Sequence, residues 1–147
     1  MNSPPIKPRT RRKRGVVGVI FRDARLLVIR RAQRVTAPGK LCLPGGGIES
    51  GESEEEALVR EMQEELAIDV TPRCLCYRSV TSWGTNLAWW HAELSASQMP
   101  TANPLEVADV FWMSREDVRT ANNLLPSLPP FLTAWEGGEI EPPCEWC

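Results

Sequence analysis

The sequence predicts a layered α/β or α+β domain, in which the strands of a sheet alternate with two or three helices. Short runs rich in Val, Ile and Leu recur along the chain, and one later segment has a clear helical period. A chain of 147 residues with 42% hydrophobic side chains is long enough for one domain with a real core. We expect this domain over residues 15–137, between a basic arm at residues 1–14 and a tail at residues 138–147.

Each expected element follows from a local pattern. Strands are indicated where apolar runs end at turn residues, and helices where a polar cap precedes a helical period. The expected strands are residues 15–21, 25–30, 41–43, 73–83, 86–94 and 107–113. Between them, residues 22–24 are expected to form a turn and residues 45–47 a glycine loop. A short helix opens at Ser114 with Asp117, and a last helix is expected within the Pro-punctuated residues 124–135.

The clearest helix is predicted over residues 51–66. Ser53 can cap it, and Glu56 stands three residues later, as in a capping box. Glutamates at positions 54–56 suit the positive end of the helix dipole. The buried stripe, spaced by four residues, is Leu58, Met62 and Leu66.

The same helix concentrates negative charge. Eight acidic residues fall between Glu49 and Glu65, against one base, Arg60. Because positions three and four apart share a helix face, Glu61, Glu64 and Glu65 are neighbours. Grouped carboxylates form the oxygen-rich kind of site that Mg²⁺ prefers. The simpler alternative is a solvated acidic face, which composition alone would favour.

The spacing around Arg60 resembles the Nudix box, and this overturns the simpler alternative. In that pattern a glycine is followed, after fixed intervals, by Glu, by Arg-Glu and an aliphatic residue, and then by Glu-Glu. Those positions are Gly46, Glu52, Arg60-Glu61, Met62 and Glu64-Glu65. Ala67 stands where the family has glycine, which bears on the helix exit and removes no carboxylate.

Similarity to Nudix hydrolases implies an α/β/α sandwich around a central mixed β-sheet. It also implies Mg²⁺-dependent hydrolysis of a phosphoanhydride bond in a nucleoside-diphosphate-type substrate, with Mn²⁺ as a substitute ion. The alternatives are a non-catalytic nucleotide-sensing or RNA-binding module on the same fold, and a prenyl-diphosphate isomerase. The isomerase is less well matched, because no clear additional cysteine and histidine metal set is present.

The resemblance implies a role for each matching residue. The catalytic set would be Glu52, Arg60, Glu61 and Glu64, with Glu61 as a base toward water and Arg60 paired with Glu52. The metal ligands would be Glu61, Glu64, Glu65, the Gly45 carbonyl and a further glutamate from a later loop. Glu106 is the first candidate for that glutamate and Glu93 the second; for Glu106, an exposed loop acid is an equal alternative.

The substrate is predicted less sharply, as a (d)NTP, a nucleotide sugar or a related nucleotide. Trp83 and Trp89 are expected to border the cleft, where an indole face can stack on a base, although tryptophan is more often a core residue. Arg30 and Lys40 flank the box and could contact phosphates or remain solvated. His91 is expected to be an ordinary strand histidine.

Charge and cysteine usage bear on partners and compartment. The first fourteen residues carry six Lys or Arg and no acid, whereas the rest has 11 basic and 19 acidic groups. Residues 7–14 could contact nucleic acid, with a solvated tail as the commoner explanation. An odd number of cysteines and the lack of an apolar leader lead us to expect a cytoplasmic protein without a membrane span, and free thiols at Cys144 and Cys147. A small-molecule nucleotide is the expected partner, and a homodimer is left open.

Overall fold

The computed structural model describes residues 13–140. Residues 1–12 of the predicted arm, and the Cys144 and Cys147 pair, lie outside the described residues. The elements, in chain order, are β1 (Arg14–Val19), β2 (Phe21–Arg22), β3 (Arg25–Arg31), β4 (Leu41–Cys42), β5 (Gly45–Gly47), α1 (Glu54–Leu66), β6 (Val70–Val80), β7 (Asn86–Leu94), β8 (Val107–Met113), α2 (Arg115–Thr120) and α3 (Leu128–Glu136).

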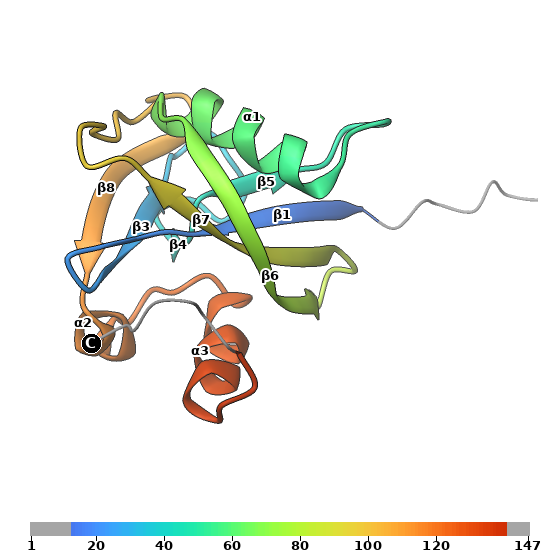
Figure 1. Ribbon diagram of the computed structural model, residues 1–147. Coiled ribbons are helices and arrows are strands. Elements are labelled where there is room, and N and C mark those ends of the chain that lie inside the picture. Colours follow the sequence, from blue (N-terminus) through green and yellow to red (C-terminus); the bar gives the residue numbers. More distant parts are fainter. Residues whose placement is uncertain (1–12, 141–147) are drawn as a thin grey trace, which may run out of the picture.

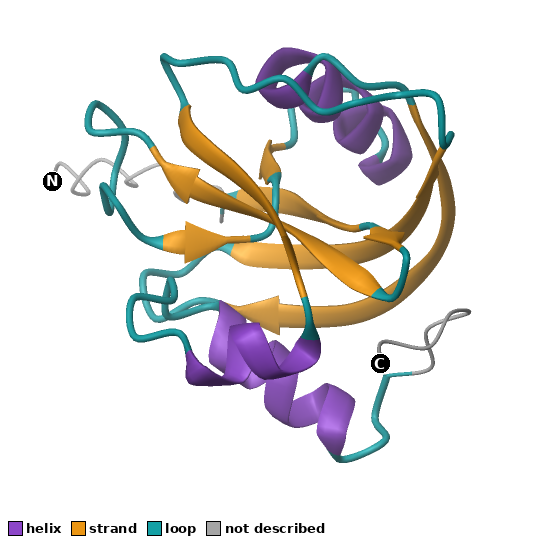
Figure 2. Cartoon of the chain, turned by 90° about the vertical axis from the view of Figure 1, so that its left-hand side faces the viewer, coloured by secondary structure: helices purple, strands orange, loops and turns teal. Residues whose placement is uncertain are grey.

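The strands form two sheets between layers of helix. One sheet has the order β5-β1-β7-β6, in which β1 and β7 are parallel and the other pairs antiparallel. The other sheet contains β2, β3 and β4, with β8 paired to β3. Helix α1 lies on one side of the strands, and α2 and α3 lie on the opposite side (Figures 1 and 2). This arrangement confirms the predicted α/β/α sandwich with a mixed sheet.

The central residues of β1 and β3 are apolar because both faces of these strands are covered. In β1, Val17 packs in the cluster that contains Phe131 of α3, whereas Val16 packs in the cluster beneath Met62 of α1. In β3, Val28 packs in the first of these clusters and Leu27 in the second. A continuous Val/Ile/Leu run is the expected signature of a strand buried on both faces.

Helix α1 has the caps that the sequence predicts. The Ser53 hydroxyl accepts from the Glu56 amide at 3.0 Å, and the Glu56 carboxylate accepts from the Ser53 amide at 3.1 Å. Ala67 adopts the left-handed conformation, with φ of 53°, and its amide donates to the Gln63 carbonyl at 3.1 Å. The helix exit therefore keeps the backbone shape that glycine would favour, at a cost of about 1 kcal/mol for the alanine side chain. Within residues 13–140, no helix combines the length and apolar character that a membrane crossing requires.

Several expected element boundaries differ from the structure, including the start of α1, which lies at Glu54 and not at residue 51 because Ser53 is its cap. Residues 45–47, expected to form a loop, pair with β1 as strand β5, and a Cβ at Gly45 would overlap the Val16 carbonyl oxygen. The absence of a side chain is thus what permits this close pairing. Strand β6 runs from Val70 to Val80 and not from 73 to 83, because residues 81–85 form a turn closed by the Thr81 amide on the Thr85 carbonyl. The domain was expected to span residues 15–137. In the structure, strand β1 begins at Arg14 and Ile140 still packs in the core.

Candidate active site

The buried carboxylates of α1 lie directly on the glycine strand β5. A Cβ at Gly46 would collide with the carboxyl group of Glu61, so this carboxylate rests against bare backbone. The next helical turn brings Glu65 to the same strand, where its Oε1 accepts from the Gly45 amide at 3.1 Å. Both side chains are largely buried, with 9% of Glu61 and 5% of Glu65 exposed. Helix and strand therefore form one carboxylate-lined surface.

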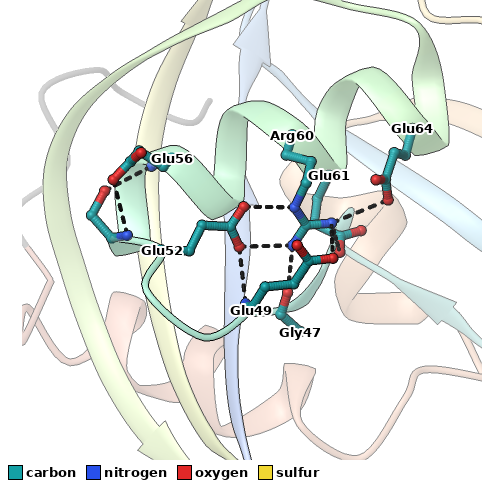
Figure 3. A network of polar contacts seen from close by, with 8 residues as sticks. Gly47, Glu49, Glu52, Glu56, Arg60, Glu61 and Glu64 are labelled. Carbon is teal, nitrogen blue, oxygen red and sulfur yellow. Dashed lines mark hydrogen bonds and ion pairs between the residues drawn. The ribbon is translucent and has the colours of Figure 1, made fainter.

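Arg60 is the cationic centre of this surface (Figure 3). Its guanidinium donates to both carboxylate oxygens of Glu52, at 2.6 and 2.9 Å, which is the bidentate geometry of a strong charge-assisted pair. It also donates to Glu61 at 2.9 Å, to Glu64 at 3.2 Å and to the Gly47 carbonyl at 2.8 Å. Arg60 thus connects the loop before α1, strand β5 and two helix carboxylates. Its bond to Glu52 is the pairing that the sequence predicts.

The buried carboxylates raise one another's pKa. Burial, together with the negative charges of Glu61 and Glu106, raises the pKa of Glu65 to about 9, and the Gly45 amide opposes the change. Burial likewise raises the pKa of Glu61, against the effect of Arg60 and with added repulsion from Glu64 and Glu106. A carboxylate cluster without enough nearby cations holds protons that a bound cation would replace.

Glu106 joins this cluster from the loop before β8. Its charge acts on both Glu61 and Glu65, and its buried Oε2 has no hydrogen-bond partner in the described part of the chain. The second candidate, Glu93, is elsewhere: its carboxylate is exposed and accepts from Arg73 at 2.6 Å. A buried carboxylate oxygen without a partner is costly, and its position beside two other acids is compatible with a site for a bound cation.

The donor set fits a hard divalent ion, since it consists of carboxylate oxygens and the Gly45 backbone. Within residues 13–140, no three His, Cys, Asp or Glu side chains are arranged as a complete ligand group. In this arrangement Glu61 is bonded to Arg60 and Glu65 to the Gly45 amide. Small side-chain rotations would be required for these groups to reach one ion.

A cavity of about 580 Å³ adjoins the glycine strand, a volume within the range of small-molecule sites. Strand β5 forms one wall, and residues 125–128, which lead into α3 and include its first residue, form another. Its charged lining residues, among those described, are all basic: Lys13, Arg14 and Arg31. The cavity therefore has basic side chains in its lining and shares the glycine strand with the carboxylates, none of which lines it.

Not every predicted substrate contact reaches this cavity. Trp83 lines it and is 55% exposed, whereas Trp89 is 1% exposed, with one ring face stacked on Phe131 at 4.5 Å. This placement makes Trp89 part of the core and of the cavity floor. Arg30 lies over the Phe111 ring and 3.9 Å from Asp109, and neither it nor Lys40 is among the lining residues. Their neighbour Arg31 lines the cavity instead.

No local sequence pattern marks the wall formed by residues 125–128. The segment that leads to them is joined to β4 by a short bridge, in which the Leu41 amide donates to the Asn123 carbonyl at 2.9 Å and the Leu125 amide donates to the Leu41 carbonyl at 2.8 Å. Such a contact between distant segments leaves no periodic pattern. Arg31 is distinguishable from Arg30 only by strand alternation, because neighbouring residues point to opposite faces. Its guanidinium is held by the Thr36 carbonyl at 2.6 Å and the Thr36 hydroxyl at 3.0 Å.

The Glu52–Arg60 pair predicts a pH-dependent stability. The Arg60 hydrogen bond, helped by the Glu49 amide, lowers the pKa of Glu52 from 4.5 to about 2. Because the folded pKa is the lower one, the stabilisation is fully present above 4.5 and is lost as the pH falls toward 2. Glu52→Gln should therefore lower the urea midpoint at neutral pH, and the difference from wild type should close in that acidic range. Glu55→Gln, at an exposed position of the same helix, is the control; a gap that does not change with pH would contradict the prediction.

Comparisons with known proteins agree with this geometry. Residues 11–135 match the family model of the NUDIX domain. The chain is 33% identical over 124 residues to the nucleoside triphosphatase NudI of Enterobacter sp. strain 638, a match that covers 74% of this chain and 87% of that protein. It is 42% identical over 55 residues to a putative 8-oxo-dGTP diphosphatase 2 of Mycobacterium tuberculosis, which covers 37% of this chain and only 39% of the mycobacterial protein.

Solved structures show the same fold. The MutT protein of Methanosarcina mazei Go1 superposes with a TM-score of 0.74 at 20% identity, covering 86% of this chain and 94% of that one. A MutT NUDIX hydrolase from Burkholderia pseudomallei superposes with a TM-score of 0.64 at 27% identity, covering 82% and 95%. The Arg60-centred carboxylate site, the fold and the family match together show that this chain belongs to the NUDIX family.

Proposed function

We propose that the protein hydrolyses a phosphoanhydride bond in a nucleotide, with Mg²⁺ as its cofactor. The observation that carries the proposal is the convergence of Glu61, Glu65 and Glu106 beside β5, with one buried carboxylate oxygen left without a partner in the described residues. The names of relatives, a nucleoside triphosphatase and 8-oxo-dGTP diphosphatases, support a nucleotide substrate. The adjoining basic cavity supports it independently.

The ion would be held by Glu61, Glu64, Glu65 and Glu106, with the Gly45 carbonyl as a backbone ligand. When bound, a divalent cation polarises phosphoryl oxygens, lowers the pKa of an attacking water and neutralises charge on the leaving phosphate. Arg60 keeps Glu61 and Glu64 turned toward the same side of α1. In our assignment Glu61 accepts the proton of the water, since burial raises its pKa and makes it a stronger base than an exposed glutamate.

The basic residues of the cavity complete the site. A polyphosphate chain brings several negative charges toward a surface that is itself acidic, and this repulsion must be offset for binding. Lys13, Arg14 and Arg31 line the cavity beside that surface and can pair with the phosphates that the ion does not reach. Arg31 is already oriented by Thr36, so little side-chain freedom is lost when it binds.

Phosphate release from a substrate panel tests the proposal. The panel contains nucleoside triphosphates, oxidised dNTPs, nucleotide sugars, ADP-ribose, dinucleoside polyphosphates and coenzyme A, each assayed with and without Mg²⁺. We expect turnover of at least one class that requires Mg²⁺ and falls by about 100-fold or more in Glu64→Gln. Glu64 is half-exposed, so this variant should fold normally. If no compound is turned over while the ion still binds, the hydrolase proposal is wrong for these substrates, and a nucleotide-sensing module becomes the better explanation.

A further inference from the structure

The loop between β7 and β8, residues 95–106, is hydrogen-bonded to the C-terminal end of α1 before it reaches Glu106. Two of its backbone amides donate to carbonyls of the last helical turn: Thr101 to Leu66 and Asn103 to Glu65, each at 2.8 Å. The last carbonyls of a helix have no partner within the helix and must be satisfied from outside. The loop satisfies two of them, and one belongs to Glu65, a residue of the carboxylate surface.

The Asn103 side chain adds two further bonds at this point. Its amide nitrogen donates to the Glu64 carbonyl at 3.2 Å, and its oxygen accepts from the Leu105 amide at 3.2 Å. Each end of the carboxamide thus faces a backbone group of the opposite kind, which defines its orientation. Together with its backbone bond to Glu65, Asn103 contacts two consecutive helix residues whose carboxylates belong to the candidate site.

The backbone of Asn103 also holds the segment that carries Glu106. Its carbonyl accepts from the amides of Glu106, at 3.0 Å, and Val107, at 2.8 Å. The Glu106 carbonyl in turn accepts from the Ala32 amide, just after β3, at 3.0 Å. Glu106 is therefore connected to α1 through Asn103 on one side and to the end of β3 on the other. A short series of hydrogen bonds places its carboxylate beside those of the helix.

This connection acts against a repulsion. The charge of Glu106 acts on both Glu61 and Glu65, and like charges held close together are unfavourable. A loop free of α1 would let Glu106 move away into solvent. Its Oε2 is instead buried and without a hydrogen-bond partner in the described part of the chain. The bonds of Asn103 join the loop to the helix at the residues from which Glu106 would otherwise separate.

We propose that Asn103 is a positioning residue, whose side chain ties the Glu106 loop to the end of α1 and so keeps Glu106 within reach of the cation that the helix carboxylates would share. Residues that orient metal ligands without touching the ion commonly contribute about 10-fold to 100-fold to metal affinity. The inference rests on the proposed function for the identity of the ion, but the placement of the loop can be tested without any ion.

Magnesium affinity, measured by calorimetry, is the first test. We expect Asn103→Ala to weaken Mg²⁺ binding by about tenfold. Asn103→Ser keeps a hydroxyl that can accept from the Leu105 amide but is too short to reach the Glu64 carbonyl, so it should lose nearly as much. Turnover in both variants should fall at low Mg²⁺ and recover at saturating Mg²⁺, because the substitutions leave the carboxylates themselves intact.

Gln98 provides a matched control in the same loop. Its side chain also makes two bonds to backbone groups, accepting from the Asp69 amide at 2.6 Å and donating to the Asp69 carbonyl at 3.0 Å. Asp69 follows α1 and is not part of the carboxylate surface. Gln98→Ala should therefore loosen the loop elsewhere and keep the Mg²⁺ affinity within about twofold of wild type.

Amide hydrogen exchange of the metal-free protein tests the placement of the loop directly. In Asn103→Ala, the Glu106 and Val107 amides should exchange about fivefold faster, whereas Gln98→Ala should affect Asp69 instead. Unchanged exchange at Glu106 and Val107, or Mg²⁺ affinities that fall equally in the Asn103→Ala and Gln98→Ala proteins or in neither, would overturn the inference. A wild type that bound no Mg²⁺ would refute the proposed cation site; faster exchange at Glu106 in Asn103→Ala would still support the positioning of the loop.

Discussion

Replacing Glu61 with glutamine is expected to lower kcat/KM by about 1,000-fold, the largest loss that we predict for a single side chain. Glutamine keeps the size of the side chain and its bond from Arg60 but loses the charge that would hold the cation and the basic oxygen that would accept a proton. The measurement is steady-state turnover of the best panel substrate at saturating Mg²⁺, together with Mg²⁺ affinity by calorimetry.

The same substitution should leave the melting temperature of the metal-free protein unchanged or raise it. The charge of Glu61 raises the pKa of Glu65, so its removal relieves a repulsion between buried carboxylates. Loss of activity without loss of stability is typical of residues kept for function at the expense of stability. Glu55→Gln is the matched control, an identical change at an exposed position of α1, and should retain full activity. If the Glu61→Gln enzyme kept its activity, Glu61 would not be a catalytic residue or an essential metal ligand.

Replacing Gly46 with alanine should lower kcat by on the order of 100-fold, even though it adds a single methyl group. A Cβ at this position would occupy the space of the Glu61 carboxyl group, so the carboxylate must move away from β5. Displacement of a catalytic group by about 1 Å is enough for a loss of this size. Turnover of the best panel substrate measures the effect, and circular dichroism establishes that the variant is folded.

The neighbouring glycine provides the control. A Cβ at Gly47 would meet no atom within 4 Å, and its carbonyl would still accept the bond from Arg60. Gly47→Ala should therefore keep activity within about threefold of wild type, because it changes neither the carboxylates nor the strand pairing. Equal losses in the two variants would show that general stiffening of the glycine segment, and not the position of Glu61, explains the effect.

Most residues of the carboxylate site could be proposed from the sequence. Helical spacing places Glu61, Glu64 and Glu65 together, and the capping box at Ser53 fixes where the helix begins. Glu106 could be proposed only by resemblance to the family, since it lies 41 residues beyond Glu65 in the chain. Its approach to Glu61 and Glu65 depends on how β8 pairs with β3, and local patterns do not specify such pairings.

The residues that line the cavity were much harder to predict from the sequence. Trp83 and Trp89 are six residues apart and are equivalent candidates by residue type, yet one lies on an exposed turn and the other beneath Phe131. Arg30 and Arg31 are adjacent, and only the second faces the cavity. In both cases a residue's role depends on which face of a strand meets which distant segment, so its type and local spacing did not decide the role.

By itself the sequence determined the fold class, the cap and the C-terminal end of α1, and the acidic face that α1 carries, because helix caps and side-chain periods are local properties of the chain. Tertiary structure alone decided that the glycines at 45–47 form a strand against which Glu61 rests, and that residues 125–128 close a cavity beside it. Those contacts join segments far apart in the chain. Their geometry is set by packing in three dimensions, which leaves no repeating pattern in the order of the residues.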